Sequence, residues 1–218
     1  MASTLALTAP VMSRAGEAPS VAEMQRAPAD GGVRRWAVAP GGDLSLRAAP
    51  SGDAAAVTIQ AEGAVLMNLG CATAGDQLWC QVRPYRGGAK GYAPADRLLP
   101  ATGPDGVVPM GIDESRQRAR KHDFDAEGEI PCAQEQGQAL GRCAIAVARD
   151  VGGDATAVVT FPNGFKRNLY FAHGAFVSAS ATMSGVGRDT DWQVDDGLHR
   201  IRVDDQRYEI PSTLIFGD

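Results

Sequence analysis

The chain has 218 residues, of which 26 are glycine and 13 are proline, and this density of turn formers is typical of strand-rich proteins. We predict two small domains rather than one large domain. The formal net charge of −5 and the sequence pI near 5.2 exclude a general nucleic-acid binder, which needs a basic surface. No run of about 18 apolar residues occurs, so a membrane-spanning helix is also excluded.

Residues 1–32 are rich in Ala, Pro, Ser and Gly and show no sustained apolar periodicity, which predicts a mobile or loosely docked leader. Residues 2–12 lack a basic start and are too polar for a complete export signal. They are either the tail of such a signal or a disordered Ala-rich leader.

Residues 33–100 carry a series of short strand patterns, and we predict that they form the first domain. Leu44 and Leu46 alternate with polar residues, which predicts a half-buried strand. Further strands are expected at residues 36–38, 57–59, 65–71 and 79–82. In the segment 65–71 we expect the odd-numbered positions to face inward, so that Cys71 faces the same interior as Cys80.

The four cysteines form two local pairs, Cys71 with Cys80 and Cys132 with Cys143, one in each predicted domain. The alternatives are disulfides, buried free thiols and zinc. Zinc is disfavoured because its ligands usually lie two to four residues apart. We favour disulfides, which persist in oxidising compartments and therefore favour an exported protein.

Residues 101–122 form a linker, in which acidic residues at 113–114 precede basic residues at 116–121. This order suits the helix macrodipole and predicts a short helix. The basic cluster is either a solvated helix face, which we favour, or a site for an acidic partner.

Residues 123–218 form the second domain, for which we predict an antiparallel β-meander or barrel. Strands are expected at 143–148, 155–161, 166–172, 175–181, 198–203 and 207–210. The turn formers at 152–154, 162–164 and 204–205 lie between these segments and suit tight hairpins. The predicted fold class is therefore all-β, with two domains.

The sequence offers few groups for catalysis. A cysteine nucleophile needs a neighbouring histidine, and all four cysteines are better explained as bridges. We interpret His122, His173 and His199 as surface or turn histidines rather than catalytic bases. No nucleophile-elbow, zinc-helix or phosphate-loop motif occurs, so the catalytic assignment is none.

Two acidic segments raise the question of metal binding. Residues 123–130 match the first eight positions of a calcium loop, but the twelfth position holds Gln134 and Pro131 interrupts the exit helix. We favour an acidic loop leading into a strand, and we assign no metal or cofactor. Asp189, Asp191, Asp195 and Asp196 are interpreted as solvated surface residues.

The segments Leu-Ser-Leu-Arg-Ala-Ala-Pro at 44–50 and Gly-Tyr-Ala-Pro at 91–94 give residues 34–100 a resemblance to the bacterial Src-homology-3-like domain. That family commonly carries Leu-Asn-Val-Arg-x-Gly-Pro and Gly-Trp-Val at these places, and Gly-Trp-Tyr-x-Val where residues 78–82 lie. Ser45, Ala49 and Tyr92 depart from the pattern. The segments 128–132 and 207–211 resemble an uncharacterised domain of bacterial envelope proteins.

The resemblance implies a small barrel whose groove holds a peptide or glycan against aromatic rings. It implies a ligand-binding site formed by Trp79, Tyr85, Tyr92 and Arg47. The alternative for Trp79 is that it only caps the core of the barrel.

We therefore expect a non-catalytic protein, periplasmic or secreted, that binds peptidoglycan or a periplasmic protein. One alternative is an inhibitor of a cell-wall-degrading enzyme, because Ser178, Ser180 and Trp192 weakly resemble the periplasmic lysozyme inhibitors. The other alternative is an unrecognised hydrolase.

Overall fold

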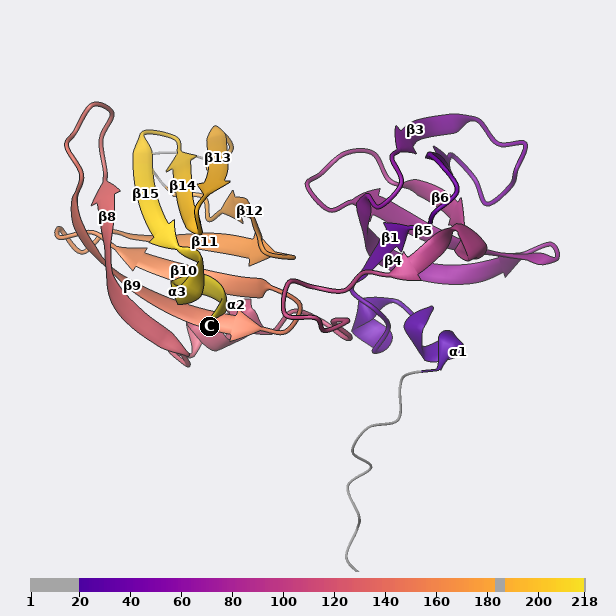
Figure 1. Cartoon of the computed structure of the whole chain (residues 1–218), viewed down its shortest axis with the longest axis horizontal. Coiled ribbons are helices and arrows are strands. Elements are labelled where there is room, and N and C mark those ends of the chain that lie inside the picture. The colour runs from indigo at the N-terminus through magenta and orange to yellow at the C-terminus, as the bar shows by residue number, and fades with distance from the viewer. Residues whose placement is uncertain (1–19, 183–186, 218) are drawn as a thin grey trace, which may run out of the picture.

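Fifteen strands form two antiparallel sheets in the computed structural model, which describes residues 20–182 and 187–217 (Figure 1). The first sheet belongs to residues 35–100 and the second to residues 126–211. The predicted all-β fold with two domains is therefore confirmed. The linker between the sheets carries the short helix α2 (Ser115–Arg120).

The first sheet has seven strands in the order β3-β2-β6-β5-β4-β1-β7. Its core consists of inward-facing side chains from alternate strand positions, among them Leu44, Leu46, Leu66 and Val82. The strands are β1 (Arg35–Val38), β2 (Leu44–Arg47), β3 (Ala56–Gln60), β4 (Val65–Ala74), β5 (Gln77–Pro84), β6 (Gly91–Pro94) and β7 (Leu98–Pro100).

A β-bulge in β4 corrects the predicted facing of this strand. Leu66 and Asn68 are buried, so the even-numbered positions face inward, opposite to our expectation. One extra residue lies between the pairs Asn68–Val82 and Cys71–Cys80, and Gly70 takes φ of 103° there. Because a bulge shifts the alternation by one position, Cys71 reaches the inner face despite its odd number.

Of the predicted leader 1–32, residues 20–32 pack on the first domain, whereas residues 1–19, with the segment 2–12, lie outside the described residues. Residues 20–32 contain α1 (Val21–Met24) and the 3-10 turn η1 (Pro28–Asp30). Asn68 is 2% exposed, and its Nδ2 donates hydrogen bonds to the carbonyls of Arg26 at 2.7 Å and Val33 at 2.8 Å. A buried amide needs such partners, so this segment satisfies the polar side chain in β4.

The second sheet has eight strands in the order β12-β11-β10-β9-β8-β15-β14-β13 and curls into a nearly closed barrel (Figure 1). Sequential strands are neighbours except β12 and β13, which form the two edges of the sheet, and β8 pairs with β15 to join the first strand to the last. The strands are β8 (Ala126–Ala133), β9 (Gly141–Asp150), β10 (Asp154–Thr160), β11 (Lys166–Ala172), β12 (Ala175–Ala179), β13 (Thr190–Asp195), β14 (Leu198–Val203) and β15 (Gln206–Pro211). All three predicted hairpin turns connect neighbouring strands.

Two strands, β8 and β13, were predicted as an acidic loop and as solvated surface. In β8, Glu127 and Glu129 are exposed while Ile130 and Cys132 are buried. The acidic residues therefore mark the outer side of a strand rather than a loop. In β13, Asp191 and Asp195 are exposed on an edge strand that pairs only with β14 among the described residues.

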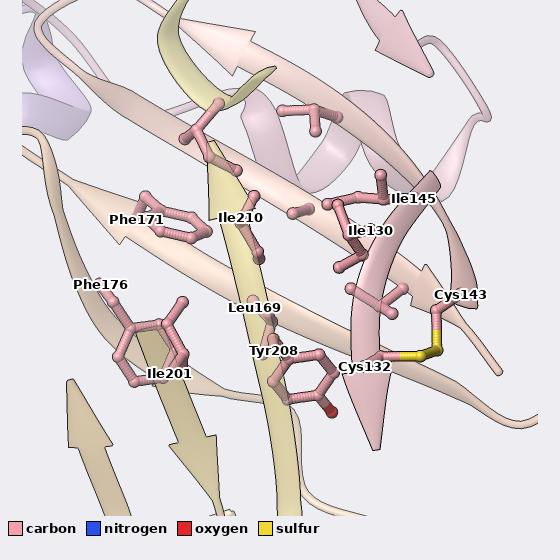
Figure 2. Packing of buried hydrophobic residues seen from close by; sticks show 14 of the residues in the cluster. Ile130, Cys132, Cys143, Ile145, Leu169, Phe171, Phe176, Ile201, Tyr208 and Ile210 are labelled. Carbon is pink, nitrogen blue, oxygen red and sulfur yellow. A yellow bond between two sulfur atoms is a disulfide. The ribbon is translucent and has the colours of Figure 1, made fainter. Parts of the chain in front are cut away.

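Large side chains fill the barrel interior (Figure 2). Leu169, Phe171, Tyr208 and Ile210 come from β11 and β15 and are at most 1% exposed. The C-terminal helix α3 (Ser212–Phe216) adds Ile215 to the same cluster. This packing leaves the outer surface of the barrel as the place where a ligand can bind.

Helix α2 packs one side on the second domain, while Arg116 and Arg120 of its basic face are exposed, as predicted for a solvated helix face. Ser115 and Ala119 are buried, and the Ser115 hydroxyl lies 2.9 Å from the Thr156 hydroxyl of β10. The Arg116 guanidinium lies 3.9 Å from the centre of the Tyr170 ring, a cation–π contact.

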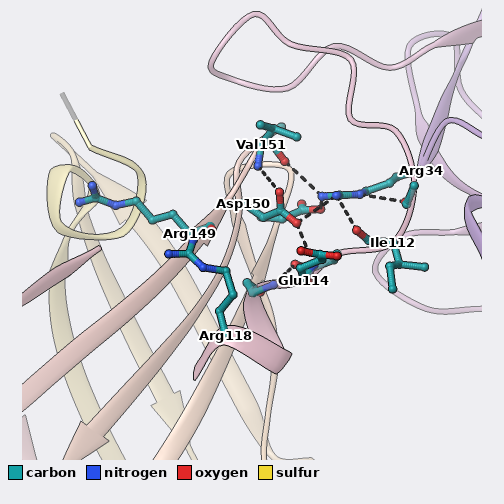
Figure 3. A network of polar contacts seen from close by, with 12 residues as sticks. Arg34, Ile112, Glu114, Arg118, Arg149, Asp150 and Val151 are labelled. Carbon is teal, nitrogen blue, oxygen red and sulfur yellow. Dashed lines mark hydrogen bonds and ion pairs between the residues drawn. The ribbon is translucent and has the colours of Figure 1, made fainter. Parts of the chain in front are cut away.

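A buried ion cluster joins the two domains. Arg34 donates to Asp154 Oδ2 at 2.9 Å and to Asp150 Oδ2 at 3.0 Å, and Arg35 pairs with the other oxygen of Asp154. Arg34 also donates to the linker carbonyls of Gly111 and Ile112 (Figure 3). Burial raises the pKa of the Asp154 carboxyl, and the positive charge of Arg35 opposes that rise.

The linker packs closely against the turn between β9 and β10. Gly152 has φ of 77°, and a Cβ there would lie 2.5 Å from Pro109 Cγ. The Gly152 amide donates to Asp105 Oδ2 at 2.6 Å. A side chain at position 152 would therefore separate the linker from the second domain.

The disulfides Cys71–Cys80 and Cys132–Cys143 are both present, as the spacing predicted. Their loops of nine and eleven residues imply a stabilisation of about 2.5–3 kcal/mol per bridge in the chain-entropy model. We expect the double variant Cys132→Ala/Cys143→Ala to lose about that much unfolding free energy in urea. Non-reducing peptide mapping should recover both local pairs, and a cross-domain bridge would contradict the structure.

Replacing Asp154 by Asn should destabilise the protein by about 3 kcal/mol or more, because the buried Arg35 would lose its carboxylate partner and Arg34 would keep only Asp150. Urea denaturation followed by tryptophan fluorescence measures this loss. Asp189→Asn is the matched control, since its ion pair with Arg202 is exposed and should contribute little. Equal effects of the two changes would show that the junction is not held by charge.

Candidate functional site

The outer face of the first sheet carries a row of polar and aromatic side chains. Arg47 on β2 lies opposite Tyr92 on β6, and Tyr92 lies opposite Gln81 on β5. Their strand neighbours Leu46, Val82 and Ala93 are fully buried. By the two-residue period, Arg47, Gln81 and Tyr92 therefore project together from the opposite side. We call these three residues the outer row.

Polar contacts hold the outer row in place. The Gln81 amide donates to the Tyr92 hydroxyl at 3.0 Å, and Arg47 Nη1 donates to the Ala54 carbonyl at 2.9 Å. All three side chains stay half-exposed. Each retains hydrogen-bonding groups that a ligand can use, because an amide, a phenol and a guanidinium each form several bonds.

Exposed apolar residues lie beside the outer row on the edge strand β3. Ile59 is 63% exposed and lies opposite Ser45, whose position on β2 shares the face of Arg47. Val57, two residues earlier, is 41% exposed. Apolar side chains next to hydrogen-bonding groups are typical of surfaces that bind a partner. Sequence reasoning missed Gln81 and Ile59, although their alternation with inward residues was visible.

The structure separates the four predicted ligand-binding residues. Arg47 and Tyr92 come together as described. Trp79 lies on the same face of β5 as Gln81 but is only 5% exposed, opposite Ala72 and Pro94 in the neighbouring strands. It therefore supports this face rather than offering a free ring.

Tyr85 lies at the domain junction instead of beside Tyr92. Its ring contacts the ring of His173 edge-on, at 6.1 Å between centroids. The neighbouring Arg86 guanidinium lies 5.5 Å from the Tyr85 ring and 4.9 Å from the Trp192 ring of the second domain. Tyr85 and Arg86 thus bridge the two domains, and Trp79, Tyr85 and Tyr92 do not form one cleft.

His199 is buried in the barrel, so its interpretation as a surface or turn residue was wrong. It is 1% exposed and projects inward with Ile201 and Val203 from β14. Trp192 Nε1 lies 3.0 Å from its Nδ1, and the Ser212 hydroxyl lies 2.9 Å from its Nε2. Burial lowers the pKa of His199, which favours the neutral ring.

The contact between Ser212 and His199 has the spacing of a nucleophile and base. An indole N–H can only donate, so Nδ1 of His199 accepts from Trp192. In a neutral ring the proton then lies on Nε2, which donates to the Ser212 oxygen. In this tautomer His199 cannot take the proton of Ser212, which a serine nucleophile requires.

The other two histidines lie in turns, as predicted. His122 is exposed with φ of 59°, and His173 has φ of 51° in the turn between β11 and β12. Burial lowers the pKa of His173, and the positive charge of Arg35 lowers it further. The His173 amide donates to Asp154 Oδ1 at 3.1 Å, so this turn belongs to the domain junction.

Several of the acidic residues considered for metal binding pair with arginine. Asp123 and Asp125 both accept from Arg118 at 2.8 Å, and these contacts lower the pKa of both carboxyls. Asp189 pairs with Arg202 at 2.9 Å. Within residues 20–182 and 187–217, no group of three or more Asp, Glu, His or Cys residues is arranged to hold a metal ion.

The residues that resemble lysozyme inhibitors serve contacts within the barrel. The Ser180 hydroxyl accepts the Asn168 amide at 3.1 Å, and its carbonyl accepts from the buried Arg167 at 2.6 Å. Ser178 pairs with Tyr170 across β11 and β12. Trp192 stacks on His199 with 5.9 Å between centroids.

No protein-family model, curated protein or solved structure significantly matches this chain. The resemblance to the Src-homology-3-like domain therefore stays a prediction based on the quoted segments. In the part of the chain that the structure describes, no helix is long and apolar enough to cross a membrane.

We expect His199 to make stability fall as the pH drops below its unfolded pKa of about 6.5. The folded pKa is lowered, so below pH 6.5 the unfolded chain binds a proton that the folded ring resists. This contribution is complete above about pH 7.5. In urea denaturation, His199→Gln should show a smaller stability loss between pH 7.5 and 5.5 than the parent, by up to about 1.4 kcal/mol per pH unit.

The comparison between the parent and His199→Gln decides this prediction. An identical pH dependence in the parent and in His199→Gln would contradict it.

Proposed function

We propose that this protein is a non-catalytic binding protein that holds an extended peptide-like ligand on the outer face of its first domain. The ligand comes from peptidoglycan or from a protein of the same compartment. The observation that carries the proposal is the outer row of Arg47, Gln81 and Tyr92 beside the exposed Val57 and Ile59. This row lies in the segment that resembles the bacterial Src-homology-3-like domain.

The chemistry of the outer row suits an extended chain. Tyr92 offers a ring face and a hydroxyl, Gln81 offers an amide, and Arg47 offers a guanidinium that can bind a carboxylate. Ile59 and Val57 add apolar area at the sheet edge. Peptides with both amide and carboxylate groups present matching partners to this combination.

An exported location supports a ligand of this kind. Both cysteine pairs form disulfides, and disulfides persist in oxidising compartments such as the periplasm or the extracellular medium. We therefore propose a periplasmic or secreted protein. The tautomer of His199 supports a binding role, since the pair of Ser212 and His199 lacks a usable base.

The test is co-sedimentation of the purified protein with sacculi, alongside pull-down from an envelope extract with the immobilised protein. Tyr92→Ala and Arg47→Gln should each weaken binding by about 1–3 kcal/mol, the range for residues that anchor an interface. Binding to sacculi would identify peptidoglycan, and specific capture from the extract without sacculus binding would identify a protein partner. Variants are compared at matched folded fraction.

Val194→Ala is the control, because Val194 is an exposed residue of the second domain, 49% exposed, and lies outside the outer row. Tyr85→Ala should leave ligand binding intact, since Tyr85 faces the domain junction. The proposal fails if Tyr92→Ala and Arg47→Gln bind as the parent does.

A further inference from the structure

The second domain carries a groove on its outer surface that the proposed function does not use. The groove has a cavity volume of about 630 Å³ and lies across β8, β9, β10 and β11 at the end of α2. Volumes of this size are typical of ligand sites. The core of the barrel lies on the other side of the same strands, where Ile145, Val147 and Val159 are buried.

The strand register shows how the groove is built. Among the described residues that line the groove, two rows of side chains cross the sheet from β8 to β11. The first row is Glu127, Ala146, Val158 and Asn168, and the second row is Glu129, Ala144, Thr160 and Lys166. Alanines therefore form the floor on β9 and β-branched residues form it on β10, while polar residues form the walls on β8 and β11.

The end of α2 closes one end of the groove with Ala119, Arg120, His122 and Phe124. His122 adopts a left-handed backbone conformation, and its ring contacts Phe124 at 6.0 Å between centroids. Arg118 holds this turn by pairing with Asp123 and Asp125. Strained backbone that neighbouring contacts hold in place is often found at functional positions.

The width of the groove selects an extended chain. Four neighbouring strands place the two walls about 14 Å apart at the backbone, because strands are spaced by about 4.8 Å. The wall side chains narrow this space further. A helix with its side chains is about 10–12 Å wide and would fill nearly all of this space, whereas a single extended peptide leaves room for its side chains to reach both walls.

One wall is acidic, and the other carries the basic Lys166 in the row of Glu129 and the neutral Asn168 in the row of Glu127. Glu127 and Glu129 are two residues apart on one wall, as are Lys166 and Asn168 on the other, and Arg120 adds a positive charge at the closed end. In an extended peptide lying flat on the floor, successive side chains point to opposite walls. Side chains that point to the same wall are about 7 Å apart. Glu129 pairs with Arg142, but both side chains are largely exposed and can exchange partners.

We infer that this groove binds an extended peptide segment whose residues alternate between basic and acidic. The basic side chains face Glu127 and Glu129, and the acidic side chains face Lys166 and Arg120. The small residues Ala144 and Ala146 let the peptide backbone approach the sheet. This site is separate from the outer row on the first domain.

The test compares two tetrapeptides of equal composition with capped termini, acetyl-Lys-Glu-Lys-Glu-amide and acetyl-Lys-Lys-Glu-Glu-amide. Each is titrated into the isotope-labelled full chain at about 0.15 M salt and followed by NMR. The alternating peptide should shift the amide resonances of β8 to β11 around the groove. It should bind at least about fivefold more tightly than the peptide in which like charges are adjacent, because only alternating charges match both walls.

Ala144→Phe should weaken binding of the alternating peptide at least tenfold, because the ring would occupy the exposed floor. Ala89→Phe, at an exposed position of the first domain, is its control. Glu127→Gln/Glu129→Gln should remove the preference between the two peptides, whereas Glu135→Gln should retain it.

Three results would overturn the inference. These are equal binding of the two peptides to the parent, unchanged binding to Ala144→Phe, and resonance shifts that lie outside the groove. None of these measurements involves the ligand of the first domain, so they remain informative whatever the outcome of the sacculus experiment.

Discussion

The ion cluster at the domain junction is the constraint on which the arrangement of this protein depends. Arg34, Arg35 and Asp154 are almost completely buried, and charges in such a position need partners close by. The cluster brings together the start of β1, the linker carbonyls and the turn between β9 and β10. It also places the His173 turn against Tyr85, which keeps that ring at the domain junction and apart from Tyr92.

Because side chains fill both cores, the binding chemistry of this protein lies on outward strand positions. The outer row on the first sheet and the groove on the second sheet have the same physical origin. In each case, buried neighbours in the strand fix the direction of the exposed side chains, and cross-strand pairing sets which of them meet. The two surfaces differ in chemistry, since the first combines a tyrosine with exposed aliphatic residues and the second combines small residues with charged walls.

Buried polar residues specify several details of the fold. Asn68 anchors the segment 20–32, and Arg167 donates to Gln206 and Asp204 across one end of the barrel. His199 joins Trp192 to Ser212 near α3. Each of these groups loses hydration on folding and regains hydrogen bonds only in one arrangement, so they favour a single packing over alternatives.

Local patterns in the sequence determined the all-β class, both disulfide pairs and the hairpin turns of the second domain, because alternation, turn formers and short cysteine spacings act over a few residues. Only the tertiary structure decided the face of β4, where one bulge at Gly70 reversed the alternation. It also decided the burial of His199 and the separation of Tyr85 from Tyr92. These features depend on contacts between strands and between domains that are far apart in the sequence, and a local pattern carries no information about such contacts.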